Sequence, residues 1–325
     1  MGTTLKGRRV VITGASSGIG LATALRFARD GARLALIARS EDGLRSAARA
    51  VEDEGATAVV LPADITDRTA IEAAIARAAQ LLGGVDVLVP CAAGLAYGAF
   101  TDLRPEDFDR ALDVTFRGAV NTVRAGLPEL ERSGGTLVAV VSMASKIGVP
   151  LHSPYVSAKF ALRGFLSSLR VELRHQGSAV DVCMVHPAFI GTPFFDHATS
   201  ADGTKPRPLR PVYRVEDVAE AVVACARHPR AEIHVGGSAT AANALAMLSR
   251  PLMELALATY GVVGQRGPDP APKRGMLWEP SGEGATTGSV PGRRSLWTAA
   301  RRAAGLPLDL MDDVPGLRRI VRLAR

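Results

Sequence analysis

The sequence predicts an α/β fold, a doubly wound parallel sheet in three αβα layers with a C-terminal extension. Short β-branched runs alternate over the first 240 residues with longer alanine- and leucine-rich amphipathic segments, which is the pattern of strand–helix–strand units. Most of the short runs are apolar throughout, as strands are when both faces of a parallel sheet are covered. The 325 residues are 47% hydrophobic and 22% charged, which excludes a disordered chain.

Each expected strand is a β-branched or aliphatic run, and each expected helix is an amphipathic segment between two such runs. Alternation at this spacing predicts right-handed crossovers between parallel strands. The expected strands are Arg9–Thr13, Arg33–Ala38, Ala58–Pro62, Val85–Val89, Thr136–Ser142, Asp181–His186 and Glu232–Val235. The expected helices are Gly18–Asp30, Glu41–Glu54, Asp67–Leu82, Pro105–Arg132, Pro154–His175 and Val215–Ala226.

One long insertion interrupts this alternation. Residues 191–214 contain Pro193, Pro206, Pro208 and Pro211 and separate the sixth strand from the next helix. Loops that follow the carboxyl ends of strands cover the ligand crevice of an open α/β sheet. We therefore expect residues 191–214 to form a lid.

The chain after the sheet divides into two parts. Residues 241–263 are largely apolar but contain Arg250, Pro251 and Glu254, which predicts one or two helices that pack on the domain or at an oligomer interface. From residue 264 the composition shifts to Gly, Pro, Ser and Arg, which predicts a poorly packed basic extension over residues 264–325. Residues 1–240 are then the catalytic domain.

The formal net charge of +7 would ordinarily indicate nucleic acid or an anionic membrane as a partner. However, residues 1–263 carry 28 basic and 26 acidic side chains, whereas residues 264–325 carry 11 and 6. The nearly neutral body also lacks a basic stripe interleaved with aromatic residues, so a nucleic-acid partner is not expected.

The end of the tail is amphipathic. Leu317, Ile320, Val321 and Ala324 fall on one helical face, and arginines occupy much of the rest. Such a helix could lie on an anionic membrane as a peripheral contact, dock on the body, or dock on a second subunit.

Cysteine and histidine spacing predicts neither a disulfide framework nor a metal site. Cys91, Cys183 and Cys225 stand far apart, and the six histidines lack metal-ligand spacing. No signal peptide pattern and no uninterrupted run of 18 apolar residues occurs. We therefore expect a cytoplasmic protein.

A glycine-rich turn joins the first strand to the first helix. It reads Thr13-Gly14-Ala15-Ser16-Ser17-Gly18-Ile19-Gly20. Small residues let the backbone approach a pyrophosphate, and a helix N-terminus presents N–H groups and a positive dipole end to it. The expected cofactor-binding residues here are Gly14, Ser16, Ser17, Gly18, Ile19 and Gly20.

The ends of the next two strands bear on the cofactor. Where an NAD-binding fold usually has an acidic residue, this chain has Ala38 followed by Arg39, which could pair with a 2′-phosphate. This favours NADP(H) over NAD(H), although Arg39 could instead be a solvated surface side chain. Asp64, after the third strand, could accept a hydrogen bond from the adenine amino group or cap the following helix.

Tyr155 and Lys159 form the most informative pair. At i and i+4 on a helix they share one face, and an ammonium beside a phenol should lower the pKa of Tyr155 from about 10 toward working pH. Such a tyrosine can give or take a proton at a carbonyl or hydroxyl oxygen while hydride moves at carbon. Ser142, 13 positions earlier, could hold the same oxygen.

These motifs, with the segment His186-Pro187-Ala188-Phe189-Ile190-Gly191-Thr192, resemble the short-chain dehydrogenase/reductase family over roughly residues 7–237. The resemblance implies a seven-stranded Rossmann sheet and, by analogy, a homodimer or homotetramer. It also implies that Tyr155 is the general acid/base, that Lys159 contacts the nicotinamide ribose and that Ser142 orients the substrate. The remaining implied cofactor contacts are Asp64, Ile65, Ala92, Pro187, Ala188 and Thr192.

The chain departs from the family pattern at three places. The family's Asn-Asn-Ala-Gly reads Pro90-Cys91-Ala92-Ala93, and its Pro-Gly reads Pro187-Ala188. Where the family has an asparagine that supports a proton relay to the lysine, this chain has Thr115, whose hydroxyl could substitute. These departures bear on the efficiency of turnover rather than on its nature.

Three other side chains leave alternatives open. His152 could line the substrate pocket or lie in a solvated loop, and Cys91 is expected to be a packed small residue rather than a reactive thiol. The aromatic residues of the lid, Phe189, Phe194, Phe195 and Tyr213, could form an apolar substrate wall or pack the lid down.

Two functions are consistent with the sequence. The first is an NADPH-dependent carbonyl reductase, or the reverse alcohol dehydrogenase, which acts on a mid-sized, fairly apolar substrate. The second is a catalytically weak dinucleotide-binding regulatory or scaffold protein, motivated by Thr115 and by the Pro90-Cys91 replacement. Intact Ser142, Tyr155 and Lys159 favour the enzyme.

Overall fold

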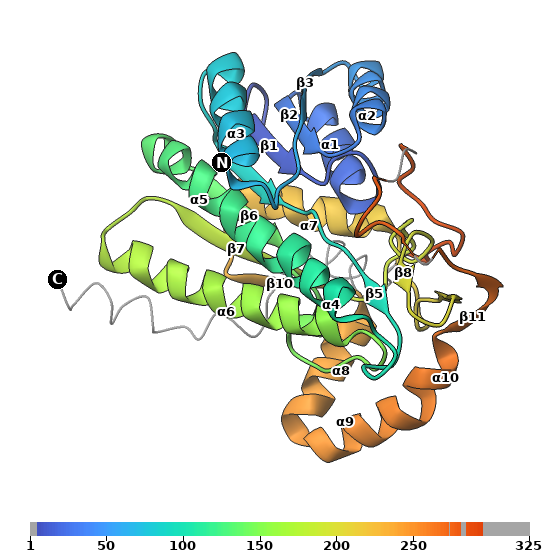
Figure 1. Cartoon of the computed structure of the whole chain (residues 1–325). Coiled ribbons are helices and arrows are strands. Elements are labelled where there is room, and N and C mark those ends of the chain that lie inside the picture. Colours follow the sequence, from blue (N-terminus) through green and yellow to red (C-terminus); the bar gives the residue numbers. More distant parts are fainter. Residues whose placement is uncertain (1–4, 273, 281–283, 295–325) are drawn as a thin grey trace.

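The fold is built on one parallel sheet of seven strands (Figure 1). A computed structural model describes residues 5–272, 274–280 and 284–294. The strand order is β10-β7-β6-β4-β1-β2-β3, and every neighbouring pair is parallel. The strands are β1 (Arg9–Thr13), β2 (Arg33–Ala38), β3 (Thr57–Pro62), β4 (Val87–Pro90), β6 (Thr136–Val140), β7 (Asp181–Pro187) and β10 (Glu232–Val235).

Helices cover both faces of this sheet and give the three layers that the sequence predicts. Apolar residues of α1 (Gly18–Arg29), α2 (Glu41–Asp53) and α7 (Val215–Arg227) form one core with the sheet. Those of α3 (Arg68–Leu82), α5 (Gly118–Ser133) and α6 (Ser153–His175) form the other core. The all-apolar strands are thus buried on both faces.

The strand order locates the ligand crevice. The chain moves outward through β2 and β3 on one side of β1, and then returns to place β4 on its other side. Crossover connections diverge at such a switch point and leave a crevice at the carboxyl ends of the strands. The crevice therefore lies beside the ends of β1 and β4.

Two boundaries differ from the sequence prediction for a physical reason. The strand expected to reach Ser142 ends at Val140, because Ser142 starts a 3-10 turn, Met143–Ser145, whose Ala144 amide donates to the Ser142 hydroxyl. The helix expected over Pro105–Arg132 is interrupted. A π-helical turn, Asp113–Arg117, separates α4 (Pro105–Leu112) from α5.

The predicted lid contains structure of its own. Strand β8 (Thr199–Ser200) pairs with β5 (Ala96–Tyr97), and β9 (Thr204–Pro206) pairs with β11 (Arg266–Pro270). Residues of the C-terminal extension are therefore joined to the lid. Within the extension Leu277 is fully buried, although most of the described residues from 264 onward are exposed or half-buried.

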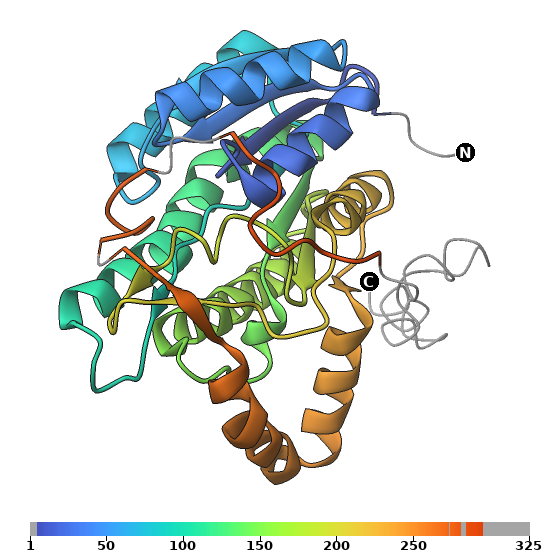
Figure 2. The same ribbon diagram turned by 90° about the vertical axis from the view of Figure 1, so that its right-hand side faces the viewer.

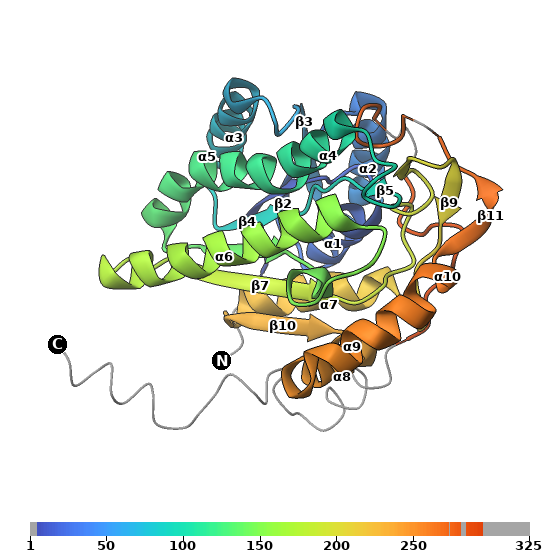
Figure 3. The ribbon, with the colours of Figure 1, turned by 60° about the horizontal axis from the view of Figure 1, so that its bottom comes forward.

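Residues 237–264 form a helical arm at the β10 edge of the sheet (Figure 3). It comprises α8 (Gly237–Leu248), α9 (Arg250–Ala256), a π-helical turn (Leu257–Gly261) and α10 (Val262–Gly264). Large apolar side chains of the arm are exposed rather than packed: Leu248, Leu252, Leu255, Tyr260 and Val263. Over the described residues, no helix combines the length and the apolarity that crossing a bilayer requires. The amphipathic helix expected at residues 316–325 lies outside the described residues.

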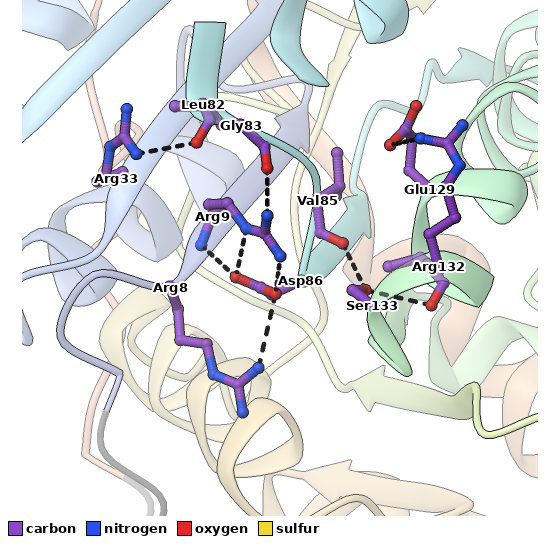
Figure 4. Close-up of polar contacts among 11 residues, drawn as sticks. Arg8, Arg9, Arg33, Leu82, Gly83, Val85, Asp86, Glu129, Arg132 and Ser133 are labelled. Atoms are coloured by element: carbon purple, nitrogen blue, oxygen red, sulfur yellow. Dashed lines mark hydrogen bonds and ion pairs between the residues drawn. The ribbon is translucent and has the colours of Figure 1, made fainter. Parts of the chain in front are cut away.

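Asp86 ties the start of β4 to the start of β1 (Figure 4). Its carboxylate accepts hydrogen bonds from the Arg9 backbone amide and from Arg9 Nε, each at 2.9 Å, and pairs with Arg8 at 3.7 Å. Burial opposes the charged form of Asp86, but these hydrogen bonds outweigh burial and lower its pKa below the usual range. The pair therefore holds together the two strands between which the crevice opens.

We expect Asp86→Asn to lower the free energy of unfolding by about 2 kcal/mol at pH 7, because charge-assisted hydrogen bonds to Arg9 are lost. The folded-state pKa is lowered, so this stability is present above the unfolded pKa and disappears as pH falls through the folded pKa. Urea titrations at pH 7 and near pH 3 measure this. The matched control is Glu41→Gln, which breaks the exposed Glu41–Arg45 pair. A wild-type/variant difference that persists undiminished at acid pH contradicts the assignment.

Candidate active site

Close backbone packing positions the glycine-rich loop. Gly14 has a φ of +70°, and a Cβ there would lie 2.7 Å from Ala92 Cα. A Cβ on Gly20 would lie 2.1 Å from the Gly14 carbonyl oxygen. Only glycine fits these two positions, so the loop brings the ends of β1 and β4 and the start of α1 into contact.

The N-terminus of α1 points its amides at the crevice. The helix begins at Gly18, and the Ser17 side chain makes no capping hydrogen bond. The first amides of a helix have no partner inside it and attract anions. Ser16, Ser17, Gly18, Ile19 and Gly20 all line the crevice. The cradle that only glycine permits, together with these donors, fits the pyrophosphate of a dinucleotide.

One crevice collects nearly all of the predicted site residues. It contains about 1490 Å³ of empty space, part of it open to solvent. Besides the residues of the glycine-rich loop, its lining includes Arg39, Asp64, Ile65, Ala92, Ser142, Tyr155, Lys159, Pro187, Ala188 and Thr192. Of the predicted site residues, Thr115 does not line it.

Arg39 is engaged by the C-terminal extension. Its guanidinium donates to the backbone carbonyls of Met276, Leu277 and Glu279. Burial lowers the pKa of Arg39. The interpretation of Arg39 as a solvated side chain is therefore wrong, and its donors face the crevice edge.

Asp64 has two partners near the adenine end expected from the resemblance. One carboxylate oxygen accepts from the Thr66 amide at 2.9 Å, and the other accepts from Arg110 at 2.8 Å. The following helix is capped by Asp67 instead, whose side chain accepts from the Ala70 amide. The helix-capping interpretation of Asp64 is thus wrong. Burial opposes its charged form, but hydrogen bonds lower its pKa.

Ser142, Tyr155 and Lys159 meet at the floor of the crevice. Ser142 is held by the turn that follows β6, while Tyr155 and Lys159 lie one turn apart near the start of α6. Lys159 Nζ lies 5.6 Å from the centroid of the Tyr155 ring and donates to the Val140 carbonyl at 2.9 Å. Lys159 is thereby anchored to β6 directly beneath the tyrosine.

The structure corrects the expected pKa of Tyr155. Burial raises the pKa of Tyr155 to about 12, although a hydrogen bond with Ser142 opposes the rise. Burial also lowers the pKa of Lys159 to about 8. Desolvation penalises the phenolate and the ammonium alike, and it is the largest cause of both shifts. Tyr155 is therefore a neutral phenol in this structure.

The Thr115 side chain bonds the backbone of Gly94. Its hydroxyl donates to the Gly94 carbonyl at 3.2 Å and accepts from the Gly94 amide at 3.0 Å. Thr115 is fully buried in the π-helical turn. The hydroxyl proton is engaged by the Gly94 carbonyl, so Thr115 secures the loop after β4.

The structure places both His152 and Cys91 at the crevice. His152 is buried and lines the crevice, and burial lowers its pKa to about 3, so it is neutral. The solvated-loop interpretation is therefore wrong. Burial raises the pKa of Cys91 to about 12, which keeps the thiol protonated. Cys91 is nevertheless only half-buried and lines the crevice.

An aromatic wall rises over Tyr155. Its ring centroid lies 5.4 Å from that of Phe194, which in turn lies 5.6 Å from Phe195. Phe189 stands 6.2 Å from Phe195. Tyr97 and Leu95 complete an apolar cluster beneath these rings. The lid aromatics thus pack together and also line the crevice, apart from Tyr213, which contacts the other core.

Sequence reasoning missed the far-side partners of the crevice. Arg110 bridges Asp64 and the Leu277 carbonyl, and Met276 and Pro280 line the crevice. No motif marks these positions, since Arg110 is one of many helix arginines. Among the described residues, no group of three or more His, Cys, Asp or Glu is arranged to hold a metal ion.

Comparison with known proteins identifies the family. The family model described as short chain dehydrogenase matches residues 8–203. The uncharacterized oxidoreductase YxnA of Bacillus subtilis is 36% identical over 247 residues, which are 75% of this chain and 68% of that protein. The chain belongs to the short-chain dehydrogenase family, a family of NAD(P)-dependent oxidoreductases.

Solved structures agree with this assignment. A short chain dehydrogenase from Mycobacterium paratuberculosis, solved bound to NAD, matches with a TM-score of 0.63 and 27% identity and covers 72% of this chain and 97% of its own. An alcohol dehydrogenase from Thermococcus sibiricus, solved with 5-hydroxy-NADP, gives 0.61 and 28%, and covers 70% and 95%. The two differ in the dinucleotide that they contain.

We expect Thr115→Val to lower the free energy of unfolding by about 2 kcal/mol, because the buried Gly94 amide and carbonyl both lose their partner. Thr115→Ser keeps the hydroxyl and is the matched control, with a loss below about 1 kcal/mol. Urea denaturation of both variants measures the difference. Equal losses in the two variants would show that the Gly94 contacts are unimportant.

Proposed function

We propose that this protein transfers hydride between NADP(H) and a carbonyl or secondary alcohol, with Tyr155 as the general acid/base. The observation that carries the proposal is the half-buried Tyr155 beside Ser142, with buried Lys159 beneath it, in a crevice that also contains the glycine-rich loop. The glycine-rich loop, the turn after β6 and the start of α6 are separate parts of the chain, yet residues of all three line one cavity.

The nicotinamide ring, when bound, supplies or accepts the hydride. The chain's own residues handle the oxygen atom. Tyr155, neutral with a pKa of about 12, donates its proton to the oxygen as negative charge develops on it, and Ser142 donates a hydrogen bond to the same atom. In the oxidative direction Tyr155 accepts the alcohol proton.

Lys159 makes the proton transfer easier. Once Tyr155 has given up its proton, the phenolate is stabilised by the ammonium below it, an interaction that burial strengthens. A lysine with a pKa of about 8 is largely protonated at pH 7. The Val140 carbonyl keeps Nζ in place, so little reorganisation is needed.

The substrate that fits is fairly apolar. Phe189, Phe194 and Phe195 line the crevice, with Phe194 against the Tyr155 ring, and neutral His152 adds no charge. Burying an apolar substrate against such rings is favourable, whereas a charged substrate would lose its hydration without a partner. A mid-sized ketone or secondary alcohol is therefore our proposed substrate class.

We expect Tyr155→Phe to lower kcat at least about 100-fold, because the proton donor is lost while the ring is kept. NADPH oxidation is followed against a panel of ketones that range from short aliphatic to polycyclic. Dinucleotide affinity, measured by fluorescence titration, should change less than twofold.

Two outcomes would contradict the proposal. Full activity of Tyr155→Phe would remove Tyr155 from the mechanism. Tight dinucleotide binding by the wild type without turnover of any ketone, or of any alcohol in reverse, would favour a regulatory or scaffold protein instead.

We expect Arg39→Gln to raise the Kd for NADPH about tenfold and to change that for NADH less than twofold, because only NADPH carries a 2′-phosphate for the guanidinium. Parallel titrations with both dinucleotides measure this. Arg45→Gln, on the exposed face of α2, is the matched control. Equal changes for the two dinucleotides would place Arg39 away from the 2′-phosphate.

A further inference from the structure

Two segments of the C-terminal extension cross the crevice side of the molecule, in red and orange in Figure 2. We call residues 274–280 the adenine-side segment, because they lie over Arg39 and Arg110. We call residues 284–293 the strap, because they run from the N-terminus of α1 to the lid. Both segments contact protein groups that we expect to bind the dinucleotide.

The strap occupies the first amide of α1. Gly18 N–H donates to the Ala285 carbonyl at 2.8 Å. An amide has one hydrogen, so this donor cannot serve a phosphate oxygen while Ala285 is in place. A backbone carbonyl here carries partial negative charge and satisfies the helix terminus much as an anion would.

The adenine-side segment bonds the second expected anion-binding group, the guanidinium of Arg39. Three of its backbone carbonyls, from Met276, Leu277 and Glu279, accept from the Arg39 guanidinium. Carbonyl oxygens repel a phosphate at the same donors. Two of the groups expected to bind phosphates, the Gly18 amide and the Arg39 guanidinium, are therefore satisfied by backbone oxygens of one extension.

The contact between strap and lid is closely fitted. A Cβ on Gly288 would lie 2.4 Å from the Thr192 carbonyl oxygen, and a Cβ on Gly292 would lie 2.0 Å from that of Tyr213. The Ser289 amide donates to the Asp196 carboxylate at 2.7 Å, and its hydroxyl donates to the same group. Glycine and serine at these positions allow an approach that larger residues would prevent.

We propose that this C-terminal extension is autoinhibitory: the strap takes the Gly18 amide, the adenine-side segment takes the Arg39 guanidinium, and both must leave these donors before NADP(H) binds fully. The inference rests on the proposed function, since it assumes that the crevice binds a dinucleotide. The apparent affinity is then the intrinsic affinity reduced by the fraction of molecules in which the extension is released.

The test uses full-length protein with Gly292→Ala, whose new Cβ meets the Tyr213 carbonyl and displaces the strap, and Ser289→Ala, which removes one bond to Asp196. Neither residue belongs to the proposed catalytic or cofactor-binding set. Thr287→Ala is the matched control, because Thr287 is an exposed strap residue. Titration with NADP⁺ should show a Kd that is roughly five- to tenfold lower for Gly292→Ala, lower by a smaller factor for Ser289→Ala, and unchanged for the control.

Hydrogen exchange of the wild-type strap gives an independent readout that does not require a variant to fold. Saturating NADP⁺ should speed amide exchange in residues 284–293, because the Ala285 contact is displaced. Slower exchange there, together with a higher Kd in Gly292→Ala, would mean that the strap clamps the cofactor, and would overturn the inference.

The remaining outcomes separate this inference from the proposed function. Equal NADP⁺ affinity in all variants, with unchanged exchange in the strap, overturns autoinhibition and leaves the oxidoreductase proposal standing. Absence of NADP⁺ binding in the wild type and in every strap variant overturns both. Binding that appears only in the strap variants supports both.

Discussion

The close approach of Gly20 to the Gly14 carbonyl is the constraint on which the site depends. Because no side chain fits there, α1 can begin directly at the end of β1, and its first amides point into the crevice. Gly14 meets Ala92 in the same way, so the end of β4 completes the wall. The sheet's change of direction between β1 and β4 then leaves Ser142, Tyr155 and Lys159 on the opposite side of the same cavity.

Burial dominates the electrostatics of this cavity. The i,i+4 spacing of Tyr155 and Lys159 was predictable from the sequence, and so was their shared face. The direction of the Tyr155 pKa shift was not, because it depends on how far the folded chain buries both groups. The pKa of about 8 leaves Lys159 largely protonated at pH 7, beside a neutral phenol.

The C-terminal extension shows the limit of composition as a guide. Residues rich in Gly, Pro and Ser form few regular elements, and that much of the prediction agrees with the structure over the described part. The same residues nevertheless pack closely, because glycine permits backbone-to-backbone contact at Gly288 and Gly292. Low propensity for helices and strands therefore says little about the number of contacts that a segment makes. The extension, which has no sequence motif, thus lies over the crevice, whose residues carry the clearest motifs of the chain.

The sequence by itself determined the order of strands and helices, the position of the glycine-rich turn and the meeting of Ser142, Tyr155 and Lys159. These follow from local periodicity and from glycine requirements, which neighbouring residues set. Only the tertiary structure decided that Thr115 serves Gly94, that Arg110 pairs with Asp64 and that Arg39 and Gly18 donate to the extension. The last two contacts join residues more than 230 positions apart, and no local pattern encodes a partner at that distance. The physical reason is that a residue's own side chain or amide makes it a hydrogen-bond donor. Which acceptor it meets depends on how the whole chain packs.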